Sequence, residues 1–478
     1  MSNPSFVVED QSATIAALEK RLAPAKRIDT HGAVVFLSGD KAYKLKRAVK
    51  FPYMDFSTAD RRRAMCEAEV DINRRLAPEI YLGVEKAGEN DWVVVMRRFD
   101  EDGLFDRMAE RGQLTPALMA ALGARIARYH DGLDAIRDGF GRPNDYRHSV
   151  AADIRQMREQ GERLDPPTSD ALAEKMPAAL EPYIDLVARR VEAGAIRRCH
   201  GDLHLRNIVL IDGKPVPFDA IEFSERIANI DVLYDLSFAL MDLCERKLQP
   251  LANRLLNEWI WRIAELPSAP HHQALGLLPM FLSRRASIRA FVDAQAAAVS
   301  DGDTARARDY QKVALSFLRP GPPRLMAIGG LSGSGKTTRA LQLAPGIGRV
   351  PGAVVVRSDV ERKRLAGIAL EDRMPPGSYT PEASAKIYAA MRERAEQALR
   401  AGHSVVLDAV FDKPAERQSA EALAHKVGVP FDGLWLEVPK AVAQARVTDR
   451  KGDASDATAA VVERQFDQDL GEITWRRS

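Results

Sequence analysis

Short apolar runs with alternating polar positions dominate the first hundred residues of the chain. Two strand-like runs, residues 33–39 and 41–49, meet at a Ser-Gly-Asp turn signal, and a third run covers residues 91–99. Between them, over residues 57–76, apolar side chains recur at the spacing of an amphipathic helix. The pattern therefore predicts a small region of strands with one helix.

The spacing of apolar residues becomes helical from about residue 104 to residue 318. Residues 115–133 are typical of this region, with Thr115 as the expected N-cap and Pro116 at the first helical position. The exception is residues 207–223, which contain two short apolar runs around an Asp-Gly-Lys turn. We therefore expect a mainly helical region that carries one hairpin.

A third pattern follows the Pro- and Gly-rich segment 319–324, which is the best linker candidate in the chain. Short, strongly apolar runs alternate here with helical stretches, as is typical of βαβ units on a parallel sheet. The strand-like runs cover residues 325–330, 352–359, 403–411 and 431–439. The few residues after position 471 leave room for only a short final strand.

The composition of the 478 residues is that of an ordinary globular protein, with 46% hydrophobic and 28% charged residues. The formal net charge of +2 offers no basic stripe, so we expect no nucleic-acid partner. Three scattered cysteines without CxxC spacing argue against a disulfide framework and a structural zinc site. Neither a secretory signal pattern nor a bilayer-length apolar run is visible, so we expect a cytoplasmic protein without membrane association.

A dense group of polar residues precedes the expected hairpin, where residues 199–210 read CHGDLHLRNIVL. Asp202 and Asn207 lie on the expected loop, and Asp219 follows the two short strands. Phosphoryl transfer needs a group that orients an acceptor hydroxyl, and oxygen ligands that hold Mg²⁺ against the phosphates. Two carboxylates and an amide around one hairpin supply these groups, so the sequence indicates phosphoryl transfer here.

The motifs HGDLHLRN and FDAIEF resemble the catalytic segment of aminoglycoside phosphotransferase-like and choline-kinase-like small-molecule kinases, which share the protein-kinase fold. The resemblance implies that Asp202 is the catalytic base. It implies that Asn207 and Asp219 are the Mg²⁺ ligands.

The same resemblance gives structural roles to neighbouring residues. His200 would organise the catalytic loop, and Asp231 and Asp235 would brace it from behind. For His204, a hydrogen bond within the loop is preferred over a metal role.

The N-terminal strands agree with this resemblance. The strand AYKLKRAV resembles the one that bears the ATP-phosphate lysine, for which Lys44 is preferred. Lys46 lies on the same strand face, so periodicity does not separate the two lysines. The following helix resembles the one that carries the glutamate partner, for which Glu69 is preferred over Glu67. The resemblance places adenine against a hinge near residues 96–99.

The motif GLSGSGKT fits the phosphate-binding pattern G-x-x-x-x-G-K-[ST] between an expected strand and an expected helix. Its glycines let backbone N–H groups turn toward the phosphates, and the helix N-terminus adds partial positive charge. Lys336 would reach the β- and γ-phosphates, and Thr337 would offer its hydroxyl to Mg²⁺. The nucleotide-binding residues expected in this loop are Gly330, Ser332, Gly333, Ser334, Gly335, Lys336, Thr337 and Thr338.

We expect this second site to include four more residues, which lie later in the sequence. Asp359 follows an apolar strand, at the carboxyl edge where parallel sheets bind ligands. Asp408 ends another apolar strand, where a carboxylate for Mg²⁺ is expected. Arg446 and Arg450 lie one helical turn apart before a Gly-Asp-Ala-Ser-Asp break, which suits a lid over the γ-phosphate.

Residues from about 324 to 472 resemble the compact P-loop kinases of the zeta-toxin, gluconate-kinase and polynucleotide-kinase type. The resemblance implies that Asp359 contacts or deprotonates the acceptor hydroxyl. It also implies that Arg446 and Arg450 stabilise the transferring phosphoryl group.

Together the patterns predict an α+β, bilobal, protein-kinase-like module followed by an α/β P-loop module with a parallel sheet. The arrangement resembles bacterial bifunctional phosphotransferase/ATP-binding proteins. The expected parts are a kinase-like N-lobe over residues 1–100, a helical C-lobe over 101–318, the linker 319–324 and a P-loop kinase-like domain over 325–478.

We therefore expect a cytoplasmic phosphotransferase with two Mg·ATP sites that phosphorylate hydroxyl groups of small metabolites. A sugar or aminoglycoside-like acceptor rests on the resemblance alone. Two alternatives stay open for the P-loop module, namely a polynucleotide 5′-hydroxyl kinase and a non-catalytic nucleotide-sensing domain. The sequence identifies neither the acceptor of either site nor the oligomeric state.

Overall fold

A computed structural model of the chain describes residues 6–51, 54–300, 302–375, 378–449 and 454–478. Contacts group the chain into two compact units. The first unit contains Met1–Asp145 and Arg190–Asp242, and the second contains Tyr146–Arg189 and Leu243–Ser478. The domain boundaries expected from the sequence stay a prediction.

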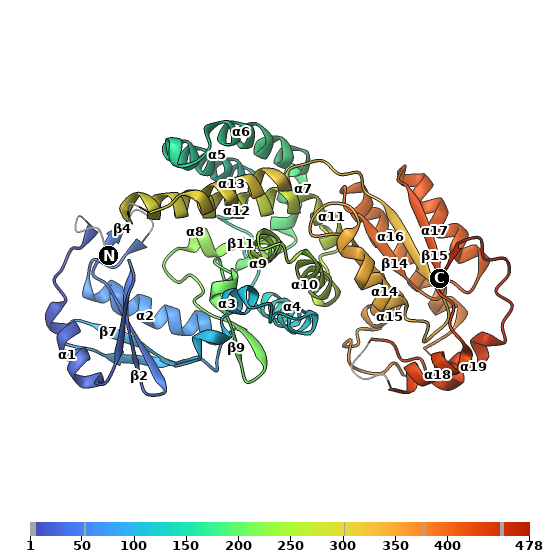
Figure 1. The fold of residues 1–478 in the computed structure, drawn as a ribbon, viewed down its shortest axis with the longest axis horizontal. Coiled ribbons are helices and arrows are strands. Elements are labelled where there is room, and N and C mark those ends of the chain that lie inside the picture. The colour runs from blue at the N-terminus through green and yellow to red at the C-terminus, as the bar shows by residue number, and fades with distance from the viewer. Residues whose placement is uncertain (1–5, 52–53, 301, 376–377, 450–453) are drawn as a thin grey trace. The chain divides into compact units, whose positions relative to one another are not determined.

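The first unit opens with a five-stranded antiparallel sheet in the order β1-β2-β3-β7-β6 (Figure 1). Its strands are β1 Lys26–Asp29, β2 Ala33–Ser38, β3 Lys41–Lys46, β6 Tyr81–Lys86 and β7 Trp92–Arg97. The other elements of this region are α1 Ser12–Leu22, β4 Lys50–Phe51, β5 Met54–Asp55 and α2 Ala59–Arg74. The strands and the helix expected from the hydrophobic pattern are confirmed.

The valines of β7 serve two hydrophobic cores, one on each face of this sheet. Val93 packs in a cluster with Leu18 of α1, whereas Val94 packs in a cluster with Val70 of α2. Successive side chains of a strand point to opposite faces, so a continuous apolar run fills both cores. Lys44 lies opposite Val94 in the register of β3 and β7, which places it on the α2 face.

A mainly helical region with short strands completes the first unit. Its elements are α3 Phe105–Glu110, α4 Pro116–Asp131, β8 Ile196–Arg198, β9 Ile208–Ile211, β10 Lys214–Pro217, α8 Glu225–Ala228, β11 Asn229–Asp231 and α9 Val232–Glu245, of which α9 ends in the second unit. Thr115 caps α4 as expected, because Leu118 N donates to its Oγ1 at 3.2 Å. The expected hairpin is β9–β10, and its turn residues Asp212 and Gly213 have φ values of 50° and 75°, which suit a two-residue hairpin turn.

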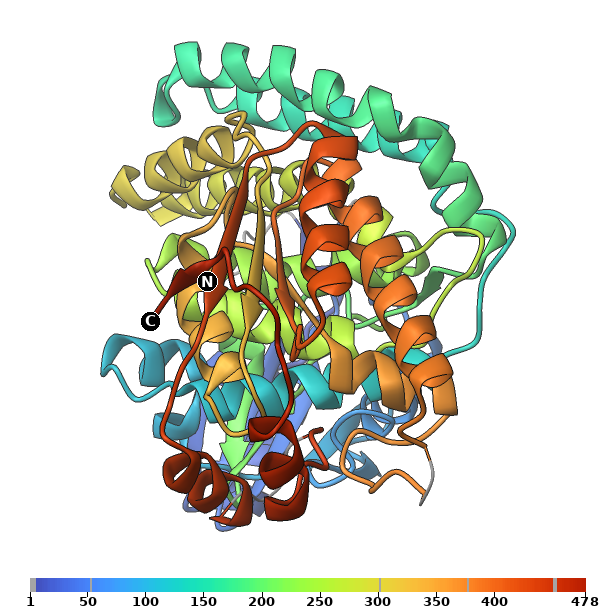
Figure 2. The same ribbon diagram turned by 90° about the vertical axis from the view of Figure 1, so that its right-hand side faces the viewer.

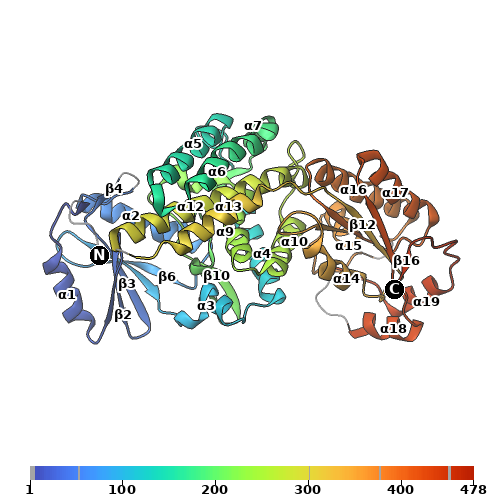
Figure 3. The same cartoon turned by 45° about the horizontal axis from the view of Figure 1, so that its top comes forward.

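Long helices make up the part of the second unit that precedes the P-loop motif. They are α5 Pro143–Glu159, α6 Pro166–Leu180, α7 Ile184–Glu192, α10 Gln249–Arg262, α11 His271–Ala274, α12 Leu278–Ser300 and α13 Ala305–Phe317, of which α5 and α7 cross the boundary between the units. Helices α12 and α13 run side by side (Figure 3). Residues 320–324, within the expected linker, form neither helix nor strand.

The remainder of the second unit is built on a five-stranded parallel sheet in the order β13-β14-β12-β15-β16. Its strands are β12 Leu325–Gly329, β13 Val354–Arg357, β14 Val405–Asp408, β15 Phe431–Trp435 and β16 Arg476–Arg477. Its helices are α14 Lys336–Leu343, α15 Ser358–Ala366, α16 Pro381–Arg400, α17 Pro414–Val427, α18 Lys440–Asp449 and α19 Ala459–Phe466, and Figure 2 shows α16 and α17 together beside the strands. The expected βαβ order and the short final strand are confirmed.

Every residue of β12, β13 and β14 is buried. This burial explains their continuous apolar runs, because both faces of a parallel sheet are covered and neither face needs polar residues. Within the described ranges of the chain, no helix combines the length and the apolarity of a membrane span.

Candidate active sites

The first site begins at the loop between β8 and β9. Its 3-10 turn, Leu205–Asn207, brings the Asn207 amide back onto Asp202. Nδ2 of Asn207 donates to the Asp202 carbonyl oxygen at 2.9 Å and to Asp202 Oδ2 at 3.0 Å. His204 Nε2 lies 3.3 Å from the same Oδ2, and Asp202 keeps 37% of its side chain exposed. The loop therefore holds one solvent-accessible carboxylate in a fixed orientation.

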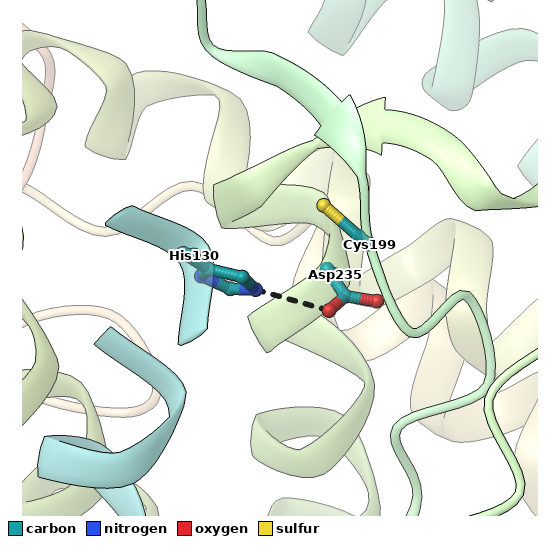
Figure 4. Close-up of side chains that lie close together, drawn as sticks. All are labelled: His130, Cys199 and Asp235. Carbon is teal, nitrogen blue, oxygen red and sulfur yellow. Dashed lines mark hydrogen bonds and ion pairs between the residues drawn. The ribbon is translucent and has the colours of Figure 1, made fainter. Parts of the chain in front are cut away.

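Asp235 of α9 fixes the start of this loop. Its Oδ1 accepts a hydrogen bond from Gly201 N at 2.8 Å, and its Oδ2 accepts one from His200 N at 3.3 Å. Figure 4 shows the ring of His130 from α4 pointing at the same buried carboxylate, with Nε2 and Oδ2 3.0 Å apart. Asp235 thus occupies the bracing position that the sequence resemblance implied.

Cys199 completes a buried group with His130 and Asp235, and their ligand-type atoms lie within 4.8 Å of one another (Figure 4). Thiolate, imidazole and carboxylate are ligands that Zn²⁺ uses. Both Asp235 oxygens already accept hydrogen bonds from the loop, however, and the Cys199 thiol donates to the Ile230 carbonyl oxygen at 3.5 Å. The geometry therefore favours a brace over a metal site.

His200 organises the loop as a neutral ring. Burial lowers the pKa of His200 below its ordinary value. Its Nδ1 accepts a hydrogen bond from Asp202 N at 3.3 Å, and its Nε2 lies 2.8 Å from the Phe218 carbonyl oxygen, to which only a protonated Nε2 can donate. This tautomer ties the loop that carries Asp202 to the residue immediately before Asp219.

Two further buried carboxylates anchor the segments around the loop. Asp231, an expected brace, binds Arg190 through two contacts of 2.6 and 2.8 Å. Asp242 of α9 accepts a hydrogen bond from Leu205 N at 2.9 Å. Sequence reasoning missed Asp242, because an acidic residue at helical spacing is usually a surface residue.

Lys44 of β3 lies between two carboxylates from distant segments. Its Nζ is 2.9 Å from Glu69 Oε1 of α2 and 2.7 Å from Asp219 Oδ1, which follows β10. Glu67 instead pairs with Arg63 on the exposed face of α2. The structure therefore brings together Lys44, Glu69 and Asp219, the residues preferred from the sequence.

Lys46, the other lysine on this strand face, shares Glu69 with Lys44 and has a second buried partner, Glu222. Its Nζ lies 2.6 Å from Glu69 Oε2 and also contacts a carboxylate oxygen of Glu222. The two lysines and the two glutamates thus alternate in one chain of charges, in which both oxygens of Glu69 are paired. Sequence reasoning assigned no role to Glu222, although a glutamate within the apolar segment AIEF was a signal of a paired buried charge.

The charges of this chain stabilise one another. Burial alone would lower the pKa of Lys44, but Asp219 and Glu69 raise it well above its ordinary value. Burial would likewise raise the pKa of Glu69, but Lys44 and Lys46 lower it to about 2. Lys44 and Glu69 are therefore both charged near neutral pH, and Lys44 is available as a cation for phosphate oxygens.

Asp219 adopts a backbone conformation that L-residues rarely use, with φ of 62°. Its N–H donates to Tyr81 Oη at 3.0 Å, and the next N–H, of Ala220, donates to Asn73 Oδ1 at 2.8 Å. These buried partners hold the turn while 44% of the Asp219 side chain stays exposed. An accessible carboxylate here and the amide oxygen of Asn207 are hard oxygen donors of the kind that Mg²⁺ prefers, so the residues fit this ion.

In the second site, the glycine-rich loop between β12 and α14 requires glycine for steric reasons. Gly330 and Gly333 have φ values of 141° and 82°. A Cβ on Gly333 would lie 2.4 Å from the Ala443 carbonyl oxygen, and one on Gly330 would lie 2.6 Å from the Leu436 carbonyl oxygen. Gly335, with φ of 92°, directly precedes the helix at Lys336. The loop geometry is therefore that of a phosphate cradle at a helix N-terminus.

The expected Mg²⁺ groups of the second site touch each other. Thr337 Oγ1 donates to Asp408 Oδ2 at 2.6 Å, which brings a hydroxyl and a carboxylate to one point and fits an Mg²⁺ ion. Arg357, which the sequence did not single out, lies 3.4 Å from Thr337 Oγ1 and 3.5 Å from Asp408 Oδ2. Burial raises the pKa of Asp408, and Arg357 and Lys336 oppose that shift.

The other loop residues lie around this point. Lys336 Nζ donates to the Leu331 carbonyl oxygen at 2.9 Å, within the loop itself. Ser332 N donates to Gln465 Oε1 of α19 at 2.8 Å. Ser334 Oγ is buried without a hydrogen-bond partner among the described residues, so it can serve a ligand, whereas Thr338 is exposed.

The expected lid and acceptor residues occupy different positions. Arg446 Nη1 donates to the carbonyl oxygens of Gly333 and Ser334, each at 3.3 Å, so this arginine contacts the phosphate loop. Arg450 lies outside the described residues. Asp359 is partly exposed in the first turn of α15, directly after β13, as expected from its position at the carboxyl end of the strand.

Both regions of the chain match models of known protein families. Residues 38–271 match the model of the phosphotransferase enzyme family, and residues 325–468 match the model of an AAA domain. Uncharacterized proteins of Mycobacterium tuberculosis and Mycobacterium bovis are 29% identical to this chain over 467 residues, which is 93% of this chain and 90% of each relative.

Solved structures of kinases also resemble parts of the chain. A choline/ethanolamine kinase family protein from Mesorhizobium loti aligns with 65% of this chain and 98% of its own, at 15% identity and a TM-score of 0.38. A gluconokinase from Sinorhizobium meliloti aligns with 33% of this chain and 83% of its own, at 21% identity and a TM-score of 0.24.

Proposed function

We propose that this phosphotransferase enzyme phosphorylates a small metabolite in each of its two domains. One is a domain of the phosphotransferase enzyme family, residues 38–271, and the other is an AAA domain, residues 325–468. In each reaction, the γ-phosphoryl group of Mg·ATP passes to a hydroxyl group. The observation that carries the proposal is the meeting of Lys44, Glu69 and Asp219 from three separate segments.

In the first site, Lys44 would bind phosphate oxygens of ATP while Glu69 fixes its direction. Asn207 and Asp219 would hold Mg²⁺, which neutralises charge on the phosphates when bound. Asp202 would orient the acceptor hydroxyl. The hydroxyl oxygen forms a bond to the γ-phosphorus, the bond to the β–γ bridging oxygen breaks, ADP leaves, and Asp202 accepts the hydroxyl proton late in the step.

In the second site, the backbone N–H groups of the glycine-rich loop and Lys336 would bind the β- and γ-phosphates. Thr337 and Asp408 would hold Mg²⁺. Asp359 would contact the acceptor hydroxyl, and Arg446 would neutralise charge on the transferring group. The close contact between Thr337 and Asp408 supports these roles, because both groups must reach one ion.

Two substitutions separate the two reactions. In a screen of hydroxyl-bearing metabolites with γ-labelled ATP, Asp202→Asn should abolish labelling of one set of products, and Lys336→Ala should abolish another. Loss of a general base typically lowers kcat by about 10²- to 10⁴-fold. If Lys336→Ala preserves every labelled product but changes its ATP dependence, the P-loop domain is a nucleotide sensor. Labelling that both variants leave intact contradicts the proposal.

We further propose that nucleic acid is not an acceptor for the P-loop domain, because the chain has a net charge of only +2. The measurement is binding of 5′-hydroxyl oligonucleotides at low and moderate salt. Salt-dependent binding together with 5′-labelling would favour a polynucleotide kinase instead.

A further inference from the structure

The side chains of α10 form a ladder of hydrogen bonds along β13. Asn253 Nδ2 donates to the Ala353 carbonyl oxygen at 2.9 Å, and Asn257 Nδ2 donates to the same oxygen at 3.3 Å. Asn257 Oδ1 accepts from Val355 N at 2.6 Å, and Trp261 Nε1 donates to the Val355 carbonyl oxygen at 2.7 Å. The three side chains are spaced by four residues, so they share one face of α10.

This ladder stands where a neighbouring strand would be. β13 is an outer strand of the parallel sheet, with β14 on its other side. The outward N–H and C=O groups of such a strand need partners when they are buried. Asn253 and Asn257 are 1% and 0% exposed, so their amides supply these partners in the interior rather than at the surface.

Trp261, the last member of the ladder, is linked to the phosphate site through Arg357. The guanidinium of Arg357, the final residue of β13, lies over the Trp261 ring at 5.0 Å from its centroid. Arg357 is 7% exposed, and a cation stacked on a desolvated indole is held in a defined direction. That direction is toward Thr337 Oγ1 and Asp408 Oδ2, at 3.4 and 3.5 Å.

We propose that Trp261 is a positioning residue for the P-loop site, which acts by holding Arg357 against the Thr337 hydroxyl and the Asp408 carboxylate. A helix that lies before the linker segment in the sequence thereby sets the geometry of the groups that receive Mg²⁺. The inference rests on the proposed nucleotide site of the P-loop domain and adds to it a residue from outside that domain, which contacts Arg357 rather than the nucleotide.

The test measures how ATP binding to the full-length protein depends on Mg²⁺ concentration, by calorimetry. All proteins carry Asp219→Ala, so that the signal comes from the P-loop site. Arg357→Met should raise the Mg²⁺ concentration for half-maximal binding by about 10- to 100-fold, as expected for the loss of a group that orients metal ligands. Trp261→Leu should raise it by about tenfold, because Arg357 remains but is no longer held.

Two variants separate positioning from packing. Trp261→Phe keeps an aromatic face for Arg357 but loses the hydrogen bond to Val355, so its Mg²⁺ dependence should stay close to that of the parent. Trp259→Phe also shortens a buried aromatic side chain of α10, whose ring instead faces His271 at 5.1 Å between centroids. It should lower the melting temperature without changing the Mg²⁺ dependence.

A double-mutant cycle decides whether Trp261 acts through Arg357. Arg357→Met with Trp261→Leu should need no more Mg²⁺ than Arg357→Met alone. The proposal is overturned if the two effects add, or if Trp261→Leu only lowers the melting temperature and leaves the Mg²⁺ dependence unchanged. If Lys336→Ala does not weaken ATP binding in this background, the nucleotide site itself is wrong, which is a different result.

Discussion

In the first unit, the charges of the phosphate site stand on separate elements, with Lys44 on β3, Glu69 on α2 and Asp219 after β10. In the second unit, the phosphate cradle is one continuous turn between β12 and α14. The first arrangement depends on side-chain ion pairs across the fold, and the second depends on the backbone of a few glycines. Loss of a buried charge should therefore impair the first site, whereas a change in the glycine backbone should impair the second site.

Removal of one buried charge should have the largest effect, and only in the first unit. Lys46→Met removes the lysine that pairs with Glu222 and one of the two lysines that pair with Glu69. Breaking a buried pair in this way costs about 3–5 kcal/mol. The measurement is hydrogen exchange of peptides from β3 and α2, which reports opening of the first unit alone.

Lys46→Met combined with Glu222→Gln is the matched control for that prediction. It removes both charges of the pair, so exchange in β3 and α2 should be slower than in Lys46→Met alone. Equal exchange in the two variants would mean that the pair contributes through packing rather than through charge.

A backbone change should have the next largest effect, and only in the second unit. Gly333→Ala places a Cβ 2.4 Å from the Ala443 carbonyl oxygen at a φ of 82°. Strain of this kind costs about 1–3 kcal/mol, so nucleotide affinity of the P-loop site should fall by up to about 100-fold. Calorimetry with ATP in the Asp219→Ala background measures it.

Gly428→Ala supplies the control for the glycine loop. Gly428 follows α17 with φ of 76°, but nothing lies within 4 Å of the added Cβ. This variant carries similar backbone strain away from the phosphate loop, so it should lower the stability of the second unit and preserve nucleotide affinity. Weakened binding in Gly428→Ala would show that general strain, rather than the loop, determines affinity.

The pH dependence of the first unit should reflect Glu69. Its pKa falls from an ordinary 4.5 to about 2 in the folded protein, so the folded state binds its proton less readily than the unfolded state. The resulting stabilisation is complete above about pH 4.5 and is lost as the pH falls toward about 2.

Exchange of the α2 peptides measured from pH 5 to pH 3 checks this dependence. One proton changes the free energy of opening by at most about 1.4 kcal/mol per pH unit. In the Glu69→Gln variant, α2 should open more readily at every pH, and the free energy of opening should depend less steeply on pH. Identical slopes in the two proteins would assign the acid sensitivity to other carboxylates.

The smallest effect should come from the N-cap of the helix that carries Glu69. Thr58 Oγ1 accepts a hydrogen bond from Arg61 N at 3.3 Å. Thr58→Ala should cost about 1 kcal/mol of stability in the first unit. Activity of the P-loop domain should not change, and a loss there would contradict the separation of the two sites.

The sequence locates the phosphate loop of the second site more directly than the charges of the first site, for a physical reason. A phosphate loop is local, so its glycines, Lys336 and Thr337 stand next to one another in the chain. Lys44 and Lys46 share a strand face and both contact Glu69, and only the position of the segment after β10 shows that Lys44 also reaches Asp219. Distances between distant segments are a property of the fold, which periodicity does not contain.

The sequence did not predict the ladder of hydrogen bonds on β13, for a related reason. Asn253, Asn257 and Trp261 recur at helical spacing, and polar residues in such a pattern usually indicate a solvated face. Here the amides are buried because an open strand edge needs them. Arg357 was missed as well, since its role depends on the indole stacked over it.

The ladder also determines how this chain can be divided for expression. A fragment that starts at the linker, near residue 320, would lack α10 and leave the outer edge of β13 uncovered. Bare strand edges recruit strands from other copies, so such a fragment should self-associate. A fragment intended to be monomeric needs to begin before Gln249.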